Sequence, residues 1–336
     1  MPTISIIGTG LMGTSLALAL RGSTLRDLTI IGTDLEHASR TGAQKSGAFD
    51  HVENRLIPAV DTADIVVLAT PLMAMEALLE VIGPELPDDC VVTDVGSSKA
   101  IVLKWAEEHL PDRVNFVAGH PMAGSEASGP LNADANLFAN KVYCVIPSRN
   151  ATERAVSEVT TMVEAVGAKP LFIGAEEHDS FVAAASHLPF ILSVALVGCT
   201  SKSPNWQEIS ELAASGYRDI SRLASGDVTM HRDICHGNSE PIVGWIDAAI
   251  QELQEYRSIL ADPGSLESGT LENLFQQAKT ARTQWMAGSV QQDNRIISPQ
   301  TEMPTFGDGM AQMFFGRQGT RLRKLMSGWG DSREKK

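Results

Sequence analysis

Short, continuously apolar runs alternate with amphipathic stretches through the first half of the chain. The apolar runs have the length of strands, and the stretches between them repeat apolar residues at helical spacing. Runs that are apolar at every position are typical of strands covered by helices on both faces, so this half is predicted to be a parallel α/β sheet. The predicted strands are residues 3–8, 28–33, 65–70, 90–94, 114–118, 142–147 and 170–173, and the predicted helices are 12–20, 73–82, 99–109 and 153–166.

The pattern changes after Gly174, where long helical repeats replace the strand pattern. Residues 176–255 are predicted to be all-helical, and one further helix is predicted within 266–287. The first long helix, 179–201, is apolar on almost every face, which favours the centre of a bundle or a subunit interface. Its internal Pro189 is expected to kink the helix near His187.

These changes predict three parts: a dinucleotide-binding sheet domain at 1–173, a helical domain at 174–287, and a weakly structured tail at 288–336. The N-terminus has no charged segment followed by an apolar one, which argues against a signal peptide. No stretch free of polar residues reaches the roughly 20 residues that a membrane span needs. A cytoplasmic protein that binds no membrane is therefore expected.

Charge and cysteine content narrow the classes of function. The net charge of −14 argues against a general nucleic-acid binder, because such proteins need basic surface for phosphates. The four cysteines are far apart and form no C-x-x-C pair, so neither a disulfide framework nor a metal site is expected. The expected partner is a small-molecule substrate.

A glycine-rich turn follows the first predicted strand and opens the first predicted helix. Gly8, Gly10 and Gly13 form a G-x-G-x-x-G pattern, whose glycines permit a tight turn, close approach of a pyrophosphate and close helix–strand packing. Leu11 and Met12 lie at the helix N-terminus, where free N–H groups and the helix dipole attract phosphate. The pattern predicts a dinucleotide site; the alternative is a structural glycine turn.

Asp34 ends the second predicted strand, about 20 residues beyond the turn, where an acidic residue binds the adenosine ribose. A carboxylate there repels a 2′-phosphate and favours NAD, but His37 and Arg40 follow closely and leave NADP open. Thr70 and Pro71 follow the third long strand and are expected at the same sheet edge.

The stretch V-A-G-H-P-M-A-G-S-E-A-S, residues 117–128, places His120 at the end of a strand in a rigid Gly-His-Pro turn. Ligands of open parallel sheets bind at this carboxyl edge. His120 is therefore predicted to be the general base of a nicotinamide-dependent dehydrogenase; a turn residue is the alternative. Ser97 and Ser98 close another strand, and either cap the next helix or orient the substrate.

Five motifs occur in order: G-T-G-L-M-G-T-S, D-V-G-S-S-K, G-H-P-M-A-G-S-E, S-H-L-P and G-Y-R-D-I-S-R-L-A. Together they resemble the prephenate and arogenate dehydrogenases of tyrosine biosynthesis, over about residues 3–260. The resemblance implies a Rossmann domain, a doubly wound sheet, followed by an all-helical domain that builds a homodimer. It implies oxidative decarboxylation of prephenate to 4-hydroxyphenylpyruvate with NAD, with arogenate as the alternative substrate.

The resemblance also implies roles for single residues. His120 is similar to the catalytic histidine and Ser97 to the serine beside it. Arg222 resembles the arginine that binds a substrate carboxylate, although an intrahelical partner for Asp219 is its simpler explanation. His187 resembles a histidine that lines the cleft, and Glu126 is similar to an acidic residue at the cleft entrance. A buried histidine beside the proline kink is the alternative for His187.

Two positions depart from the family pattern and leave the choice between prephenate and arogenate open. Phe190 stands where many members have a second histidine, and His231 where a large residue such as tryptophan is common. Two other classes compete with this interpretation. A β-hydroxyacid dehydrogenase needs a lysine base, but the only lysine in 176–255 is Lys202, in a Ser/Pro-rich turn. A non-catalytic NAD-binding regulator would not need His120, Ser97 and Arg222.

Overall fold

The computed structural model describes residues 2–124 and 127–288. The chain divides into two compact units, one that ends at Ala248 and one that begins at Ala249. The first unit holds the sheet and most of the helical region, and the second is considered separately. The predicted tail, 288–336, lies outside the described residues except for Gly288.

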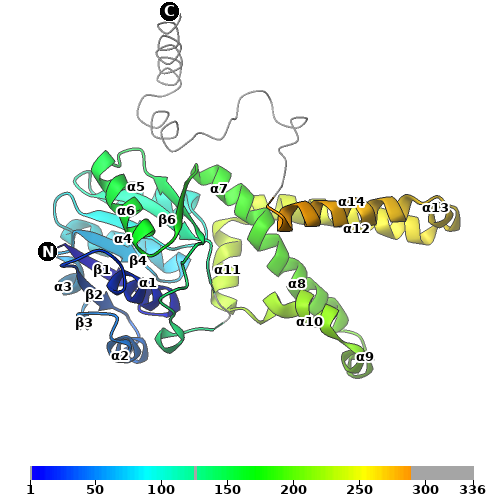
Figure 1. The fold of residues 1–336 in the computed structure, drawn as a ribbon, viewed down its shortest axis with the longest axis horizontal. Helices are drawn as coiled ribbons and strands as arrows, with labels where there is room; N and C mark the ends of the chain where they lie inside the picture. Colours follow the sequence, from blue (N-terminus) through cyan, green and yellow to red (C-terminus); the bar gives the residue numbers. More distant parts are fainter. Residues whose placement is uncertain (1, 125–126, 289–336) are drawn as a thin grey trace, which may run out of the picture. The chain divides into compact units, whose positions relative to one another are not determined.

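An eight-stranded sheet forms the centre of the first unit (Figure 1). Its strand order is β3-β2-β1-β4-β5-β6-β7-β8. From β1, the chain first adds β2 and β3 on one side of the sheet and then adds β4 and the later strands on the other side, so the strand order changes side between β1 and β4. Such a change of side leaves a crevice at the carboxyl ends of the strands. The strands are β1 Thr3–Ile7, β2 Thr29–Thr33, β3 His51–Glu53, β4 Ile65–Leu68, β5 Val91–Asp94, β6 Asn115–Pro121, β7 Val142–Pro147 and β8 Lys169–Phe172.

The sheet is parallel except between β6 and β7, which pair antiparallel. The predicted parallel sheet is confirmed, with this one strand pair as the departure. A parallel connection needs a crossover of a dozen or more residues, usually a helix. In the described part of the link between β6 and β7, the helical structure is one short 3-10 turn, η3 Pro130–Asn132, so β7 returns beside β6 in the opposite direction.

Helices cover the sheet and complete its core. Where α4 and α5 pack on the sheet, Leu68, Met75 and Trp105 are buried in one apolar cluster. A second set of buried side chains comes from α1 and α6, which contact each other. The helices of this region are α1 Leu11–Arg21, α2 His37–Ser46, α3 Leu56–Val60, α4 Met75–Ile82, α5 Ala100–His109 and α6 Glu153–Ala165, with 3-10 turns η1 Leu72–Ala74 and η2 Gly83–Glu85.

The region after β8 is helical, as predicted. In the first unit it contains α7 Ala175–Val182, the π-helix η4 Ala183–His187, α8 Leu188–Thr200, α9 Trp206–Leu212, α10 Ser215–Ser221, the 3-10 helix η5 Arg222–Ser225 and α11 Val228–Gly237. The π-helix Ala183–His187 directly precedes α8, and Pro189 lies in the first turn of α8. The kink expected at Pro189 stays a prediction.

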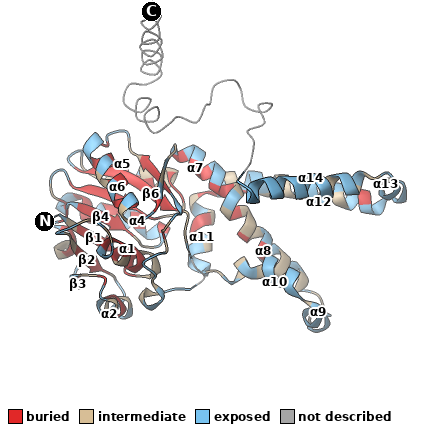
Figure 2. Ribbon diagram, viewed as in Figure 1, coloured by how far each residue is buried: buried red, intermediate tan, exposed pale blue. Residues whose placement is uncertain are grey.

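The stretch Ala175–Thr200 is long and apolar enough to cross a membrane by length and composition, and 28% of its most apolar window is buried in this single chain. Figure 2 shows how little of α8 and α10 is buried compared with the sheet. Phe181, Leu192 and Val194 are apolar side chains that this stretch leaves exposed in the single chain, as a subunit interface would require.

The second unit begins within α12, Ser239–Ala261, and continues through α13 Pro263–Glu267 and α14 Thr270–Met286. The rings of Tyr256 and Phe275 stack with their centroids 6.0 Å apart. Asp262 caps α13 by accepting hydrogen bonds from the N–H groups of Gly264 and Ser265. The helix predicted within 266–287 is thus confirmed as α14.

Candidate active site

The loop between β1 and α1 has the geometry of a phosphate-binding turn. Gly8 has φ of +98°, and a Cβ there would lie 2.4 Å from the carbonyl oxygen of Ala69. A Cβ on Gly13 would lie 1.9 Å from the Gly8 carbonyl oxygen, so both positions exclude a side chain. Gly10 differs, because the space beside its Cα is open within 4 Å. That open backbone at the start of α1 fits the approach of a pyrophosphate.

Asp34 lies where β2 ends and holds the glycine loop. Its carboxylate accepts hydrogen bonds from the N–H groups of Thr9 at 2.7 Å and Glu36 at 2.9 Å. Arg40 reaches the same turn and donates to the carbonyl oxygens of Asp34 and Leu35. A carboxylate and a guanidinium therefore stand together where the adenosine ribose of a dinucleotide would lie.

Thr70 and Pro71 follow β4 beside the glycine loop. A Cβ on Gly8 would lie 3.0 Å from the backbone nitrogen of Thr70, which places the two segments in contact. The Thr70 hydroxyl is buried, and it has no hydrogen-bond partner within the described residues. Pro71 precedes η1 and is exposed. This hydroxyl is a polar group that a dinucleotide can satisfy.

His120 stands within β6, near its carboxyl end, and is 8% exposed. The predicted Gly-His-Pro turn is wrong, because the strand continues through Pro121 in pairing with β7. His120 Nδ1 lies 2.8 Å from Nε2 of His178 in α7. His178 Nδ1 lies 2.7 Å from the Asp179 carboxylate, so three buried groups form one line.

The Asp179 carboxylate fixes the protons along this line. An ionised carboxylate only accepts, so His178 Nδ1 carries the proton that it donates to Asp179. Neutral His178 then accepts at Nε2, and His120 donates from Nδ1. The Nε2 lone pair of His120 is therefore free to accept a proton, as a general base requires.

The surroundings of His120 keep its imidazole neutral. Burial lowers the pKa of His120 well below its usual value, and positive charge on His178, Lys99 or His187, whenever that group is protonated, lowers it further. A neutral base is therefore present at pH 7 and is lost only in distinctly acidic solution.

The two candidate serines do not cap α5. Its first N–H groups, from Lys99 and Ala100, are held by the Asp179 carboxylate at 2.8 and 2.9 Å. Ser98 is fully buried, with no hydrogen-bond partner for its hydroxyl in the described chain, while Ser97 is partly exposed. The capping alternative is wrong because a residue from another helix fills that role.

His187 ends the π-helix and is completely buried. Its Nδ1 lies 3.1 Å from the side-chain amide of Asn238, and its Nε2 has no partner within the described residues. Burial lowers the pKa of His187 to about 4. The two positions that depart from the family pattern meet nearby, because the rings of Phe190 and His231 stack at 4.3 Å.

Arg222 begins η5, which packs against α8 where the N–H of Ala224 donates to the Ser193 hydroxyl at 2.9 Å. The role of Arg222 stays a prediction. Glu126 lies outside the described residues, and so does its predicted role.

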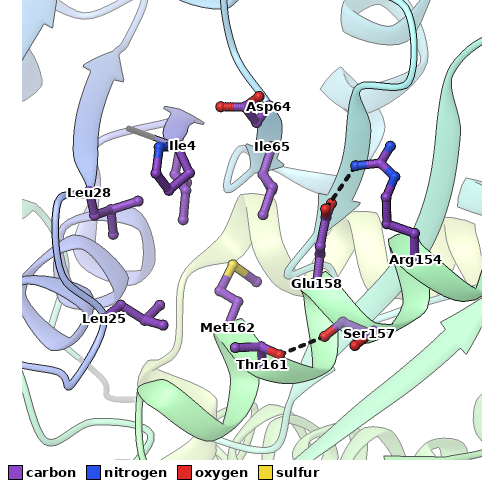
Figure 3. Close-up of a pocket in the computed structure, with 11 residues that line it drawn as sticks. Ile4, Leu25, Leu28, Asp64, Ile65, Arg154, Ser157, Glu158, Thr161 and Met162 are labelled. Carbon is purple, nitrogen blue, oxygen red and sulfur yellow. Dashed lines mark hydrogen bonds and ion pairs between the residues drawn. The ribbon is translucent and has the colours of Figure 1, made fainter.

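A hollow of about 440 Å³ lies at the opposite edge of the sheet, where β1 and β4 begin (Figure 3). Its charged groups contact protein atoms: Arg154 pairs with Glu158 Oε1 at 2.7 Å, and Asp64 accepts the N–H of Thr3. Glu158 Oε2 is buried and has no hydrogen-bond partner within the described residues. None of the predicted site residues that the structure describes lines this hollow.

Comparisons with known proteins agree with this geometry. Residues 16–171 match the nucleotide-binding domain of prephenate dehydrogenase, and residues 174–279 match its dimerization domain. Prephenate dehydrogenase of Bacillus subtilis is 35% identical over 282 residues, which cover 83% of this chain and 74% of the relative. The chain belongs to the prephenate dehydrogenase family.

Other similar proteins are named for different substrates. Cyclohexadienyl dehydrogenase of Zymomonas mobilis is 30% identical over 83% of this chain and 94% of its own length. The structure of A. aeolicus prephenate dehydrogenase with hydroxyphenyl propionate and NAD+ has a TM-score of 0.78 at 28% identity, covering 85% of this chain and 98% of that one. Synechocystis arogenate dehydrogenase has a TM-score of 0.71 at 27% identity, covering 84% and 99%.

The sequence had pointed to His120 but not to the groups behind it. His178 and Asp179 lie in the first turns of α7, where Glu176 and Glu177 are polar as well. Their burial is a tertiary effect that the sequence does not mark. Lys99 gave a weak signal as a single cation beside an apolar run.

Proposed function

We propose that this protein catalyses the NAD-dependent oxidative decarboxylation of prephenate to 4-hydroxyphenylpyruvate, with His120 as the general base. The observation that carries the proposal is the line His120–His178–Asp179, which leaves an accepting nitrogen at the carboxyl edge of the sheet. The glycine loop follows β1 and His120 lies near the end of β6, so both stand at the carboxyl edge of the same sheet, which supports the proposal. Family membership supports the choice of reaction.

The residues of the glycine loop fit NAD. Its pyrophosphate would lie against Gly10 and the N–H groups of Leu11 and Met12, while Gly8 and Gly13 close the turn.

Asp34 would receive the ribose hydroxyls of the cofactor, and Thr70 and Pro71 would line its path toward His120. The Asp34 carboxylate disfavours a 2′-phosphate, and Arg40 beside it is the feature that favours NADP. The cofactor supplies the acceptor for hydride.

The reaction needs one proton acceptor and one carboxylate-binding group. His120 Nε2 would take the proton of the ring 4-hydroxyl as a C4 carbonyl forms, and NAD held by the glycine loop and Asp34 would accept the hydride from C4. The C1–CO2 bond then breaks, its electron pair completes the aromatic ring, and the oxygen at C4 takes up a proton. The products are 4-hydroxyphenylpyruvate, CO2 and NADH, and aromatisation makes the sequence effectively irreversible.

The line of histidines spreads the charge that the first step creates. When His120 becomes an imidazolium, its Nδ1–H faces His178, whose other nitrogen faces the Asp179 carboxylate. A carboxylate placed behind the base stabilises that cation without touching the substrate. Asp179 is in turn held by the N-terminus of α5, so the whole line is anchored in the sheet domain.

The far end of the substrate would be held by groups from the helical region. Arg222 would bind the ring carboxylate, for which its planar guanidinium offers two parallel hydrogen bonds. His187 would line the cleft with its unpartnered Nε2, Ser97 would hydrogen-bond beside His120, and Glu126 would stand at the entrance. These four roles come from the resemblance to the family.

We also infer the division 1–173, 174–287 and 288–336, and a cytoplasmic homodimer joined through the helical domain. The end of β8 and the start of α7 support the first boundary. The name of the second family model, a dimerization domain, and the exposed apolar residues Phe181, Leu192 and Val194 support the homodimer. Burial of these residues in a dimer would also explain why Ala175–Thr200 is so apolar, with no need for a membrane.

The test is an assay of reduced-cofactor formation with prephenate and arogenate, each with NAD and NADP. The proposal predicts the highest kcat/KM with prephenate and NAD, together with one CO2 released for each NADH. Turnover of arogenate alone would assign the protein to arogenate oxidation, as in the Synechocystis neighbour. NAD binding without turnover of either substrate would support a non-catalytic regulator.

A further inference from the structure

Lys99 is fully buried, and its ammonium group lies among polar atoms of β5 and β6. Nζ pairs with the Asp94 carboxylate and donates to the carbonyl oxygen of Gly119 at 2.8 Å. Asp94 in turn accepts the N–H groups of Gly119 at 3.1 Å and Gly96 at 2.8 Å. A lysine is almost never fully buried unless it is paired, so this arrangement is costly and specific.

These contacts close a ring through the base. The backbone N–H of Lys99 donates to Asp179 Oδ1, the oxygen that also faces His178 Nδ1. His178 faces His120, and the residue before His120 is Gly119, which the Lys99 ammonium holds. Lys99 therefore contacts the surroundings of His120 in two places. Its backbone N–H donates to Asp179, and its side-chain ammonium donates to Gly119.

Gly119 is closely packed between its neighbours. A Cβ there would lie 2.6 Å from the Asp94 carbonyl oxygen and 2.7 Å from Cε1 of Tyr143. β6 is thus pressed against β5 and β7 at this point, and its exact register decides where the His120 ring points. A displacement of the reacting groups by about 1 Å can cost 100-fold in rate.

We propose that Lys99 is a positioning residue for catalysis, which fixes the His120 backbone through Gly119 and places a permanent positive charge behind the base. The inference rests on the proposed role of His120. The charge opposes a second cation nearby, and so keeps the imidazole neutral and ready to accept a proton.

The other titratable groups around His120 are few. His178 of α7 and His187 of η4 face it from the helical region, and Asp179 lies behind His178. From β7 come Tyr143 and Cys144, which burial keeps uncharged by raising their pKa values, that of Cys144 to about 11. On the sheet side, Lys99 is the charged group that lowers the pKa of His120, and Asp94 is its counter-ion.

The experiment compares Lys99→Met with the double variant Lys99→Met/Asp94→Asn. The single variant leaves the Asp94 carboxylate buried without its partner, which endangers folding. The double variant removes both charges, and its amide oxygen can still accept from the backbone. Lys104→Met is the matched control, since Lys104 lies on the same helix with its side chain 70% exposed.

Two readouts separate positioning from mere structural support. NMR titration of 13Cε1-labelled histidines, assigned with His120→Asn, gives the midpoint of His120 without any turnover. Steady-state kinetics with prephenate give kcat and KM for the folded fraction. We expect the double variant to raise the His120 midpoint toward 6.5 and to lower kcat about 10- to 100-fold at nearly unchanged KM. Lys104→Met should match the wild type in both.

A folded double variant with the wild-type His120 midpoint and wild-type kcat would overturn the proposal. A lower melting temperature with both readouts unchanged would also overturn it, because it would assign Lys99 to stability alone. If wild-type protein turned over neither prephenate nor arogenate, the proposed function would fail, yet the NMR midpoint would still decide whether Lys99 controls His120.

Discussion

Asp179→Asn should separate the proton arrangement of the site from its shape. The carboxylate accepts three hydrogen bonds, from Lys99 N, Ala100 N and His178 Nδ1, at 2.8, 2.9 and 2.7 Å. Asparagine has the same size but only one accepting oxygen, and its NH2 group can only donate. Both orientations of the amide weaken the base. With the amide oxygen at the Oδ1 position, which faces Lys99 N and His178 Nδ1, His120 loses the negative charge that stabilises its imidazolium. With the NH2 group there, the proton of His178 moves to Nε2 and His120 must accept at Nδ1.

His120 would then carry its proton on Nε2, facing the substrate, and could not act as a base. A tautomer forced the wrong way removes most of the benefit of a general base, so kcat should fall roughly 10²- to 10⁴-fold. Loss of a charge-assisted bond and part of a helix cap should also cost about 2–3 kcal/mol of unfolding free energy. NAD affinity should stay near the wild-type value.

The assay is NADH formation from prephenate, measured well below the melting temperature so that the variant is fully folded. Circular dichroism melts and fluorescence titration with NAD give the folded fraction and the cofactor affinity. Asp112→Asn, at an exposed position after α5, is the matched control. A folded Asp179→Asn enzyme with kcat within threefold of the wild type would refute the assignment of protons along this line.

Three further predictions follow from the site. Because the pKa of His120 is lowered, kcat/KM should stay level down to pH 6.5 and decline only as the pH falls toward the lowered value; an acid limb centred at or above 6.5 would contradict the burial of the base. His187 has a pKa of about 4 in the native state, below its value of about 6.5 in the unfolded state, so the unfolded state binds more protons between these two pH values. The free energy of unfolding should therefore keep its full value above pH 6.5 and fall by about 3 kcal/mol toward pH 4. Urea unfolding of His187→Asn should show a smaller fall over the same range. Arg222→Ala should raise KM for prephenate about 10-fold or more with NAD affinity unchanged, whereas an unchanged KM would favour an ion pair within the helix.

Much of the sheet could be predicted because its strands are short and buried on both faces. Continuous apolar runs such as 65–70 and 90–94 appear as β4 and β5 within one or two residues. The elements that were missed lack this signal. α2, H-A-S-R-T-G-A-Q-K-S, buries only Gly42 and Ala43, and β3 is three residues long at the edge of the sheet. Tertiary contacts, rather than local pattern, hold such segments in place.

The candidate site divides in the same way. The glycine loop and His120 are local signals, since turn geometry and position after a strand are visible in the sequence. The partners of His120 are not local, because His178 and Asp179 belong to α7, which follows β7 and β8 in the sequence. The cap of α5 shows the limit clearly. Ser97 and Ser98 had the right spacing for a cap, but Asp179 offers a carboxylate to two N–H groups at once and takes their place.

The most direct test of the central claim is the turnover of prephenate by His120→Asn, with NAD affinity measured on the same protein. Asparagine preserves a side chain of similar reach but cannot take up the hydroxyl proton. The account predicts a fall in kcat of at least 100-fold, with the dissociation constant for NAD within a factor of about two of the wild type. A variant that binds NAD normally and oxidises prephenate at nearly the wild-type rate would show that the proton goes to another group.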